Sequence, residues 1–489
     1  MRSLFKQLIL WLSRQYRFFS WMIVAAVSGL AIVGLIWWLS RDPTSHFLAS
    51  IPGMDGAPSR LEQVGQAVRI GEFFRLFEAA AAKLPGSWPR FRGARSDNIS
   101  EETVDLTDWW GPDGPEILWT VELGEGHAAP AVLDGRVYVL DYDEQQKADA
   151  LRCFSLANGQ ELWRRWYTVQ VKRNHGMSRT VPAVNDRYVV SIGPRCHVMC
   201  LDSRDGSFKW GIDLERDYGS EVPLWYTAQC PLLDGDTAVL APGGEQALLI
   251  GVDCRSGDVL WKTPNPSGWG MSHSSIMTMS LNGRRMYIYC AIGGVVGVSA
   301  EQGDRGALLW QTSAWSPKVV APSPVVLEGG RIFLTAGYGA GSLMLQVNES
   351  NGIYSVTPLY SYRPHEGLAC EQQTPLLYQG HLFGILPKDG GELRNQFVCF
   401  HPDGRILWSS GVTNRFGLGP FMAADGKFFI LGDDGVLTMA RATTESFQPL
   451  ATAKVLDGRD PWGPLAIAGG RMLLRDSTQM VCIDLRAGQ

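Results

Sequence analysis

The stretch VMCLDSRDGSFKW, residues 198–210, contains the pattern that decides the fold. An apolar run is followed by a polar turn with Gly206 and by a second run that opens on Trp210. Glycine suits such a turn because the backbone there needs a positive φ, and the tryptophan offers a large flat surface to bury. The stretch therefore predicts a β-hairpin whose second strand carries a buried aromatic ring.

Variants of this hairpin recur along the chain at a nearly constant spacing. The aromatic position, separated by 44, 47, 51, 49, 50 and 48 residues, is occupied by Trp119, Trp163, Trp210, Trp261, Trp310, Tyr360 and Trp408. The glycine four residues ahead of the tryptophan recurs as Gly159, Gly206, Gly257 and Gly404. Four short strands with their turns occupy about 40 to 50 residues, the length of one propeller blade. The spacing therefore predicts a β-propeller.

The eighth repeat is incomplete, and the strand that it lacks is present at the other end of the ring. The last repeat, residues 462–485, provides only three strands. The stretch EILWTVEL, residues 116–123, precedes the first full repeat and has no partner there. Pairing the two would remove two open sheet edges. We therefore expect an all-β fold over residues 87–489, an eight-bladed β-propeller closed by an N-terminal strand.

The N-terminus predicts a single membrane anchor. Residues 1–17 carry four basic side chains, and residues 18–39 contain no charge. As a helix this apolar run spans roughly 33 Å, enough to cross the hydrocarbon core. A cleaved signal peptide is the alternative, but its apolar region should be shorter and should end in small residues. The basic N-terminus predicts a single-pass protein of the inner (cytoplasmic) membrane, with the ring on the periplasmic or extracellular side.

Residues 40–86, between the anchor and the ring, are predicted to be a linker that contains a helix. Residues 43–60 are rich in Pro, Gly and Ser, a composition typical of loops. Residues 61–84 place apolar side chains at near-helical spacing, and Pro85 and Gly86 follow, as at the end of a helix. We expect a short amphipathic helix that lies against the ring or joins a partner.

Composition and cysteine usage narrow the possible functions. The net charge is −5 with both signs interspersed, so the sequence offers no basic groove for nucleic acid. Several of the nine cysteines recur at one strand of successive repeats, which favours buried apolar fillers. Cys196 and Cys200 are a candidate pair across a hairpin. A zinc site would need CxxC pairs or Cys/His clusters, and neither is present.

Polar and aromatic residues gather just ahead of the first strand of each repeat, where a propeller chain points toward its axis. The candidate ligand-binding residues are Arg179, Trp225, Tyr226, Gln229, His273, Lys318, Glu371, Gln372 and Arg415, and the same segments contain His127, His175 and Asn414. Convergent donors with one carboxylate suit an anionic or sugar-like ligand. The plainer interpretation is that these groups satisfy one another and bound waters. No catalytic set or metal site can be assigned.

The repeats, together with SWPRFRGARSDNIS at residues 87–100, resemble the PQQ-like repeat β-propellers. This family includes quinoprotein dehydrogenases and BamB-like assembly factors, and residues 87–100 look like those of a membrane-anchored, "PQQ-binding-like" branch. The resemblance implies an eight-bladed ring outside the cytoplasm, with the repeat tryptophans packed between neighbouring blades. Quinoprotein alcohol dehydrogenases resemble one another in having two adjacent cysteines over the cofactor. This sequence has no adjacent cysteines.

Three functions are compatible with these observations. The leading hypothesis is a non-catalytic binding or assembly platform for an envelope protein or a polymer, because the chain has an anchor and no assignable catalytic set. The second is a PQQ-dependent oxidoreductase that acts on an alcohol or sugar, with Lys318, Arg179 and Glu371 around the quinone. The third is a carbohydrate-binding ring that uses Trp225, Tyr226 and Trp269 as stacking surfaces.

Overall fold

The computed structural model describes residues 2–40 and 68–488, which fall into two separate units. The first unit contains helix α1 (Arg2–Leu39). Within α1, residues Phe18–Leu39 are long and apolar enough to cross a membrane, with a mean hydropathy of 2.3. The predicted anchor is therefore a continuous helix whose length and composition fit a single-pass span.

The second unit consists of eight sheets, numbered here as blades 1 to 8 in chain order. Blades 1 to 4 contain β4 (Ala131–Leu133), β5 (Arg136–Asp143), β6 (Ala148–Ser155), β7 (Glu161–Thr168); β8 (Ala183–Val184), β9 (Tyr188–Ile192), β10 (His197–Asp202), β11 (Phe208–Asp213); β12 (Leu232–Asp234), β13 (Thr237–Leu240), β14 (Leu249–Asp253), β15 (Val259–Thr263); and β16 (Met277–Leu281), β17 (Arg284–Ala291), β18 (Gly294–Ser299), β19 (Leu308–Thr312). Blades 5 to 8 contain β20 (Val325–Leu327), β21 (Arg331–Ala336), β22 (Gly341–Ser350), β23 (Ile353–Tyr362); β24 (Leu376–Tyr378), β25 (His381–Ile385), β26 (Phe397–His401), β27 (Arg405–Ser409); β28 (Phe421–Ala424), β29 (Lys427–Leu431), β30 (Val436–Arg441), β31 (Pro449–Lys454); and β32 (Ala466–Ala468), β33 (Arg471–Arg475), β34 (Gln479–Asp484), β3 (Ile117–Glu122). A short helix, α2 (Leu214–Tyr218), follows β11.

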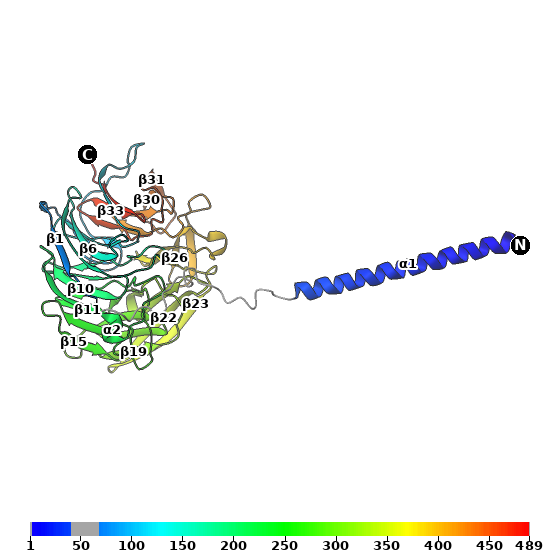
Figure 1. Cartoon of the computed structure of the whole chain (residues 1–489), viewed down its shortest axis with the longest axis horizontal. Coiled ribbons are helices and arrows are strands. Elements are labelled where there is room, and N and C mark those ends of the chain that lie inside the picture. Colours follow the sequence, from blue (N-terminus) through cyan, green and yellow to red (C-terminus); the bar gives the residue numbers. More distant parts are fainter. Residues whose placement is uncertain (1, 41–67, 489) are drawn as a thin grey trace. The chain divides into compact units, whose positions relative to one another are not determined.

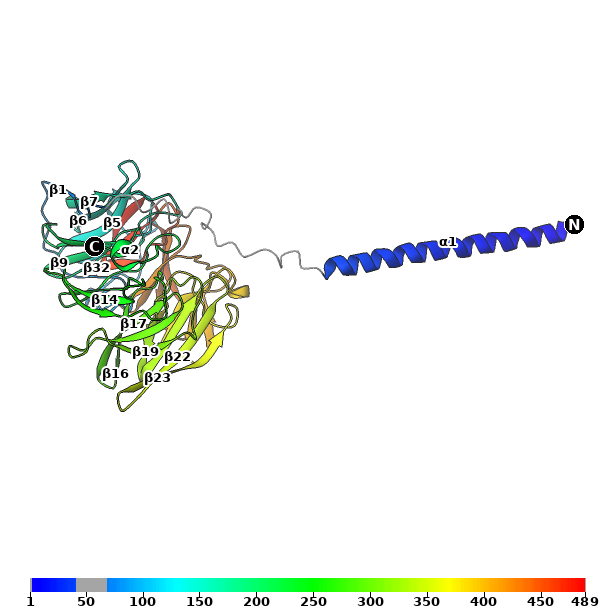
Figure 2. The same ribbon diagram turned by 60° about the horizontal axis from the view of Figure 1, so that its bottom comes forward.

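The blades are arranged around a common axis, which confirms the predicted eight-bladed β-propeller. The first strand of each blade is the innermost one, and the inner strands of neighbouring blades, such as β4 and β8 or β20 and β24, contact each other. The inner strand of the last blade, β32, contacts β4 of the first. Figure 1 and Figure 2 show the red strands of blade 8 beside the cyan strands of blade 1, although the two are far apart in the sequence.

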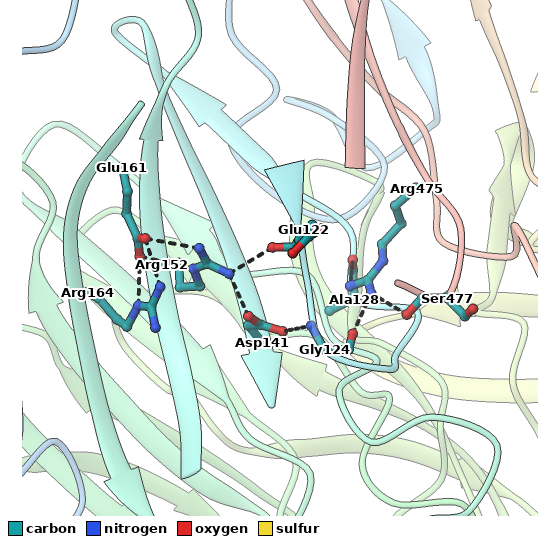
Figure 3. Close-up of polar contacts among 9 residues, drawn as sticks. All are labelled: Glu122, Gly124, Ala128, Asp141, Arg152, Glu161, Arg164, Arg475 and Ser477. Atoms are coloured by element: carbon teal, nitrogen blue, oxygen red, sulfur yellow. Dashed lines mark hydrogen bonds and ion pairs between the residues drawn. The ribbon is translucent and has the colours of Figure 1, made fainter. Parts of the chain in front are cut away.

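Blade 8 combines strands from both ends of the propeller sequence. Strand β3 pairs antiparallel with β34, and Trp119 lies opposite Cys482. At the end of β3, the Glu122 carbonyl accepts a hydrogen bond from Arg152 of blade 1 (3.0 Å), and Arg152 also donates to the Asp141 carboxylate (2.8 Å). The other Asp141 oxygen accepts the Gly124 N–H, which places the Asp141 carboxylate between Arg152 and Gly124 (Figure 3). The join between the first and last blades is therefore held by a partly buried polar network.

The repeat tryptophans pack between blades, as the sequence predicts. In each of the eight outer strands, the pairing register shifts one residue before the aromatic position. In four cases the ring lies against the hairpin glycine of the next blade, where an added Cβ would come within 2.7 to 2.8 Å of the ring: Trp119 on Gly159, Trp163 on Gly206, Trp210 on Gly257 and Trp261 on Gly306. Only glycine fits because the φ is positive and the ring occupies the space of a side chain.

This pattern changes in blades 6 to 8. In blade 6 the hairpin glycine, Gly404, is covered by Tyr362 rather than by Tyr360 at the aromatic position. In blade 7 the aromatic position is Ala451. Blade 8 has no hairpin between its two outer strands, because β34 and β3 come from opposite ends of the sequence. A large ring on blade 7 would therefore have no hairpin glycine to cover.

The helix predicted over residues 61–84 is wrong for the part that the structure describes; residues 61–67 lie outside it. Strand β1 (Phe73–Leu76) instead pairs antiparallel with β7 and becomes the fifth, outermost strand of blade 1. Phe73 stacks on Trp166 with ring centroids 5.6 Å apart. The open edge of β7 offers backbone partners that the sequence pattern cannot reveal, and aromatic residues pack well on a strand. The propeller therefore begins before residue 87.

Residues 87–100 cross the ring rather than follow its circumference. Trp88 forms a backbone bridge with Val132 of blade 1, and Arg90 donates to the Leu233 carbonyl of blade 3. Strand β2 (Ile99–Ser100) pairs in parallel with β28 of blade 7. The buried Arg92 lies between these contacts and donates to the carbonyls of residues 374 and 375 in blade 6. Because these blades lie on different sides of the ring, the segment passes across the axis.

Candidate functional site

The candidate residues lie at one end of the axis, here called the loop face. Each blade contributes two connections to this face: the one that leads in from the previous blade, and the one between its second and third strands. Residues 87–105 lie toward the opposite face, where Glu102 accepts a hydrogen bond from Gly469 in the first hairpin of blade 8. A ligand would therefore reach the axis from the loop face.

Three aromatic rings from different blades meet at the centre of the loop face. Trp225 stacks on Tyr338, with centroids 5.8 Å apart and planes 21° apart, and its centroid lies 6.0 Å from that of His273. Trp225, Tyr226 and Tyr338 all have left-handed φ values of 62°, 72° and 56°. This conformation is strained for residues that are not glycine, and such strain gathers at functional sites. We call Arg179, Trp225, His273, Tyr338 and Glu371 the axial cluster.

Arg179 supplies the positive charge of the axial cluster. One of its terminal nitrogens donates to the carbonyls of its own loop, at residues 174, 175 and 176. Its Nε is buried and meets no partner in the described chain. Burial lowers the pKa of Arg179 to about 10, although Tyr338, Glu125 and Tyr226 favour the charged form. Arg179 therefore remains a cation at neutral pH with one donor unused.

Two buried histidines beside Arg179 are neutral. Burial lowers the pKa of His273 to about 3, and the charge of Arg179 adds to the effect. The pKa of His127 is lowered to about 3 by burial and by Arg179 and Arg475. His127 Nε2 lies 3.0 Å from the carbonyl of His175. The Nδ1 atoms of His127 and His273 are buried and meet no partner among the described residues.

The carboxyl group of the cluster, that of Glu371, lies against Gly337, next to Tyr338. Burial raises the pKa of Glu371, and the charges of Asp389 and Asp433 raise it further, while Lys388 acts in the opposite direction. Burial also raises the pKa of Tyr338 to about 12, with a contribution from Glu371. The axial cluster therefore combines a cation, one neutral histidine and a carboxyl group whose charged form burial disfavours, together with the stacked rings of Trp225 and Tyr338.

The other predicted site residues take different roles. Gln229 is fully buried, and its side-chain amide forms two hydrogen bonds with the backbone of Ala241 (2.8 and 2.9 Å). Its role is therefore to stabilise the blade. Tyr226 is buried and donates to the carbonyl of Lys172 (2.6 Å). Arg415 is exposed and donates to carbonyls of blade 6. Lys318 is exposed, and Gln372 is half-buried next to Glu371.

Tyr338, Asp433 and Trp462 belong to this region but were not among the candidates. Tyr338 and Asp433 lie between the second and third strands of their blades, a connection that the sequence analysis left out. Trp462 stacks on His127 with centroids 5.1 Å apart and donates to Asp433 (2.9 Å). The signal that could have found these residues is topological: both kinds of connection end on the same face of an antiparallel blade.

The cysteines are buried and unpaired in the structure, including Cys196 and Cys200, the candidate pair. Cys196 Sγ lies 3.0 Å from the hydroxyl of Thr227. Cys200 Sγ instead contacts the carbonyl of Cys254 in the next blade (3.5 Å). The two thiols therefore have separate partners, and the cysteines serve as small fillers of the core.

Parts of this chain are similar to a known protein family and to solved structures. The family model described as outer membrane protein assembly factor BamB matches residues 147–364. Over these residues the chain is similar to that family. No curated protein sequence matches the chain. Among solved structures, a europium-containing methanol dehydrogenase has a TM-score of 0.54 at 12% identity, covering 82% of this chain and 90% of its own. BamB from Moraxella catarrhalis has a TM-score of 0.49 at 13% identity, covering 76% and 100%.

The quinone that some PQQ-like repeat propellers hold does not fit the axial cluster. A tricarboxylate ligand needs several available cations and a bound metal ion, but Arg179 is bonded to carbonyls of its own loop. No group of three His, Cys, Asp or Glu side chains in the described residues is placed to hold a metal. Trp225 and Tyr338 are in contact with each other, which leaves no slot for a third ring between them. We derive no quinone chemistry from this site.

Proposed function

We propose that the chain is a membrane-tethered propeller that acts as a non-catalytic binding or assembly platform outside the cytoplasm, with the loop face as its binding surface. The observation that carries this proposal is the set of unused polar atoms in the axial cluster. Arg179 Nε can donate, and the buried Nδ1 of the neutral His273 also meets no partner among the described residues. Buried polar groups are costly without partners, and a bound molecule could supply them.

The chemistry of the cluster favours a polar partner with both donors and acceptors, such as a protein loop or a polymer. Tyr338 is 47% exposed and Trp225 is half-buried, so the stacked pair offers aromatic contact area, as binding hot spots do. Trp269, a predicted carbohydrate platform, packs against Gly293 and Gly294 instead. The apolar helix at Phe18–Leu39 would hold the platform at a membrane.

We expect Trp225→Ala to remove most of the partner recovered with the tagged full-length chain from solubilised membranes. Losing the aromatic anchor should reduce recovery by about tenfold or more, because a hot-spot tryptophan contributes at least 2 kcal/mol. The measurement is quantitative mass spectrometry of co-purified proteins and glycans.

The matched control is Trp109→Ala. Trp109 is 67% exposed and belongs to a segment that bonds to the first hairpin of blade 7, on the opposite face. Recovery should not change in this variant. A wild-type chain that is repeatedly purified alone, or an equal loss in both variants, would contradict the proposal.

A further inference from the structure

A pocket lies on the loop face of blade 5, away from the axial cluster. Its volume is about 710 Å³, within the range of small-molecule sites. Its lining residues are Ala314, Trp315, Gly339, Ala340, Ser342, Leu343, Pro358, Ser361, Tyr362, Arg363 and Glu366. They come from the connection after β19, from the turn before β22 and the start of that strand, and from the end of β23 and the residues after it. Figure 2 labels these three strands.

Two of the lining side chains carry a buried polar atom without a partner. Trp315 is 6% exposed, and Ser342 is 1% exposed. Neither the Trp315 Nε1 nor the Ser342 Oγ has a hydrogen-bond partner within residues 2–40 and 68–488. Several repeat tryptophans also have an unpaired ring nitrogen, but their rings pack between blades. Trp315 and Ser342 instead line one hollow, so a molecule bound there could pair both atoms.

The chemistry of these groups selects the ligand. The indole N–H can only donate, and the serine hydroxyl can donate as well. Arg363 lies on the rim with an exposed side chain, and among the described residues no ion pair involves its guanidinium. Two neutral donors and one cation match a carboxylate, which accepts several hydrogen bonds and carries the opposite charge.

We propose that the blade 5 pocket binds a carboxylate, from a free acidic amino acid or from an acidic side chain of a peptide. The Trp315 Nε1 and Ser342 Oγ donate to the two carboxylate oxygens, and Arg363 supplies the counter-charge. Glu366, whose carboxylate accepts a hydrogen bond from the backbone N–H of Arg363 (3.2 Å), lies on the same rim and weakens binding by like-charge repulsion. The assignment is independent of the proposed function of the axial cluster.

Isothermal titration of the detergent-solubilised full-length chain tests this assignment with three probes: glutamate, a capped Ala-Glu-Ala tripeptide and a capped Ala-Gln-Ala tripeptide. At least one acidic probe should bind, and the Gln tripeptide should bind at least tenfold more weakly than its acidic counterpart, because hydrogen bonds to charged groups are the stronger ones. Binding of the tripeptide alone assigns a peptide ligand, and binding of glutamate alone assigns a free acid.

Single substitutions of the lining residues test whether the probes bind in the blade 5 pocket. Trp315→Phe, Ser342→Ala and Arg363→Gln should each weaken binding by about fivefold to tenfold, and Glu366→Gln should strengthen it. Ser155→Ala is the matched control, since Ser155 is equally buried with an unpaired hydroxyl but lies in blade 1. Ser342→Ala removes only a hydroxyl, so it remains informative if the tryptophan variant fails to fold. No binding of either acidic probe, equal binding of the Gln tripeptide, or an unchanged Ser342→Ala variant overturns the proposal.

Discussion

Asp149→Asn should stabilise the propeller by about 4 kcal/mol at pH 8 and leave its stability near pH 4 unchanged. Asp149, on β6, is 2% exposed, and one of its carboxylate oxygens has no hydrogen-bond partner in the described structure. The other oxygen accepts from the Tyr167 hydroxyl (2.7 Å). Burial raises the pKa of Asp149 from 3.8 to about 7; the Tyr167 bond lowers it, and Asp141 raises it.

The sign of the effect follows from the bound proton. Between pH 4 and 7 the folded chain keeps a proton on Asp149 that the unfolded chain has lost, so stability falls as pH rises through this window. Each pKa unit corresponds to about 1.4 kcal/mol, which gives about 4 kcal/mol for this shift. Asparagine carries no charge at any of these pH values, and its amide oxygen can still accept from Tyr167.

Urea unfolding of the full-length chain in detergent, followed by tryptophan fluorescence at pH 4 to 8, measures this effect. The midpoints of the two proteins should separate as pH rises and stay parallel above pH 7. Glu144→Gln, at an exposed position in the same hairpin, should follow the wild type throughout. A constant difference between Asp149→Asn and wild type across the whole range would show that Asp149 is ionised in the folded state at all of these pH values.

The ring was predictable because its determinants are local and repeated. A hairpin glycine and a tryptophan four residues later recur at the spacing of one blade, and the structure shows the ring of Trp163 covering Gly206 of the next blade. The partner of β3 could be inferred from counting, since one strand was missing at one end and one was left over at the other. Such arguments need only sequence order and edge pairing.

The missed features all depend on contacts between segments that the sequence does not pair. Strand β1 forms because β7 has an open edge, whereas its apolar spacing alone resembles a helix. Gln229 has the polarity of a ligand-binding residue, but its amide is hydrogen-bonded to the backbone of Ala241. Tyr338 reaches the axis from a turn within blade 5, and only the ring geometry shows that this turn and the loop with Trp225 share a face.

A second large effect on stability is expected at the join between blades 8 and 1. Arg152 is half-buried, with 12% of its side chain exposed, and forms ion pairs with Asp141 (2.8 Å) and Glu161 (3.0 Å); it also donates to the Glu122 carbonyl of β3. Burial alone would raise the pKa of Glu161, but hydrogen bonds from Arg164 and Arg152 outweigh it and lower this pKa. Figure 3 shows Arg152 between the two carboxylates. Removing this cation leaves two carboxylates, with side chains only 10% and 12% exposed, without full compensation.

Arg152→Met should therefore destabilise the propeller by about 3 to 5 kcal/mol, the cost of breaking a buried ion pair on one side. Arg164→Gln is the control: Arg164 pairs with the same Glu161 but is more exposed, so its loss should cost about 1 kcal/mol or less. Combining Arg152→Met with Asp141→Asn and Glu161→Gln should recover much of the loss, because the uncompensated charges are then gone. Equal urea midpoints for Arg152→Met and Arg164→Gln would mean that the network at the join contributes only as a surface pair does, and that β3 is held by its backbone pairing with β34 alone.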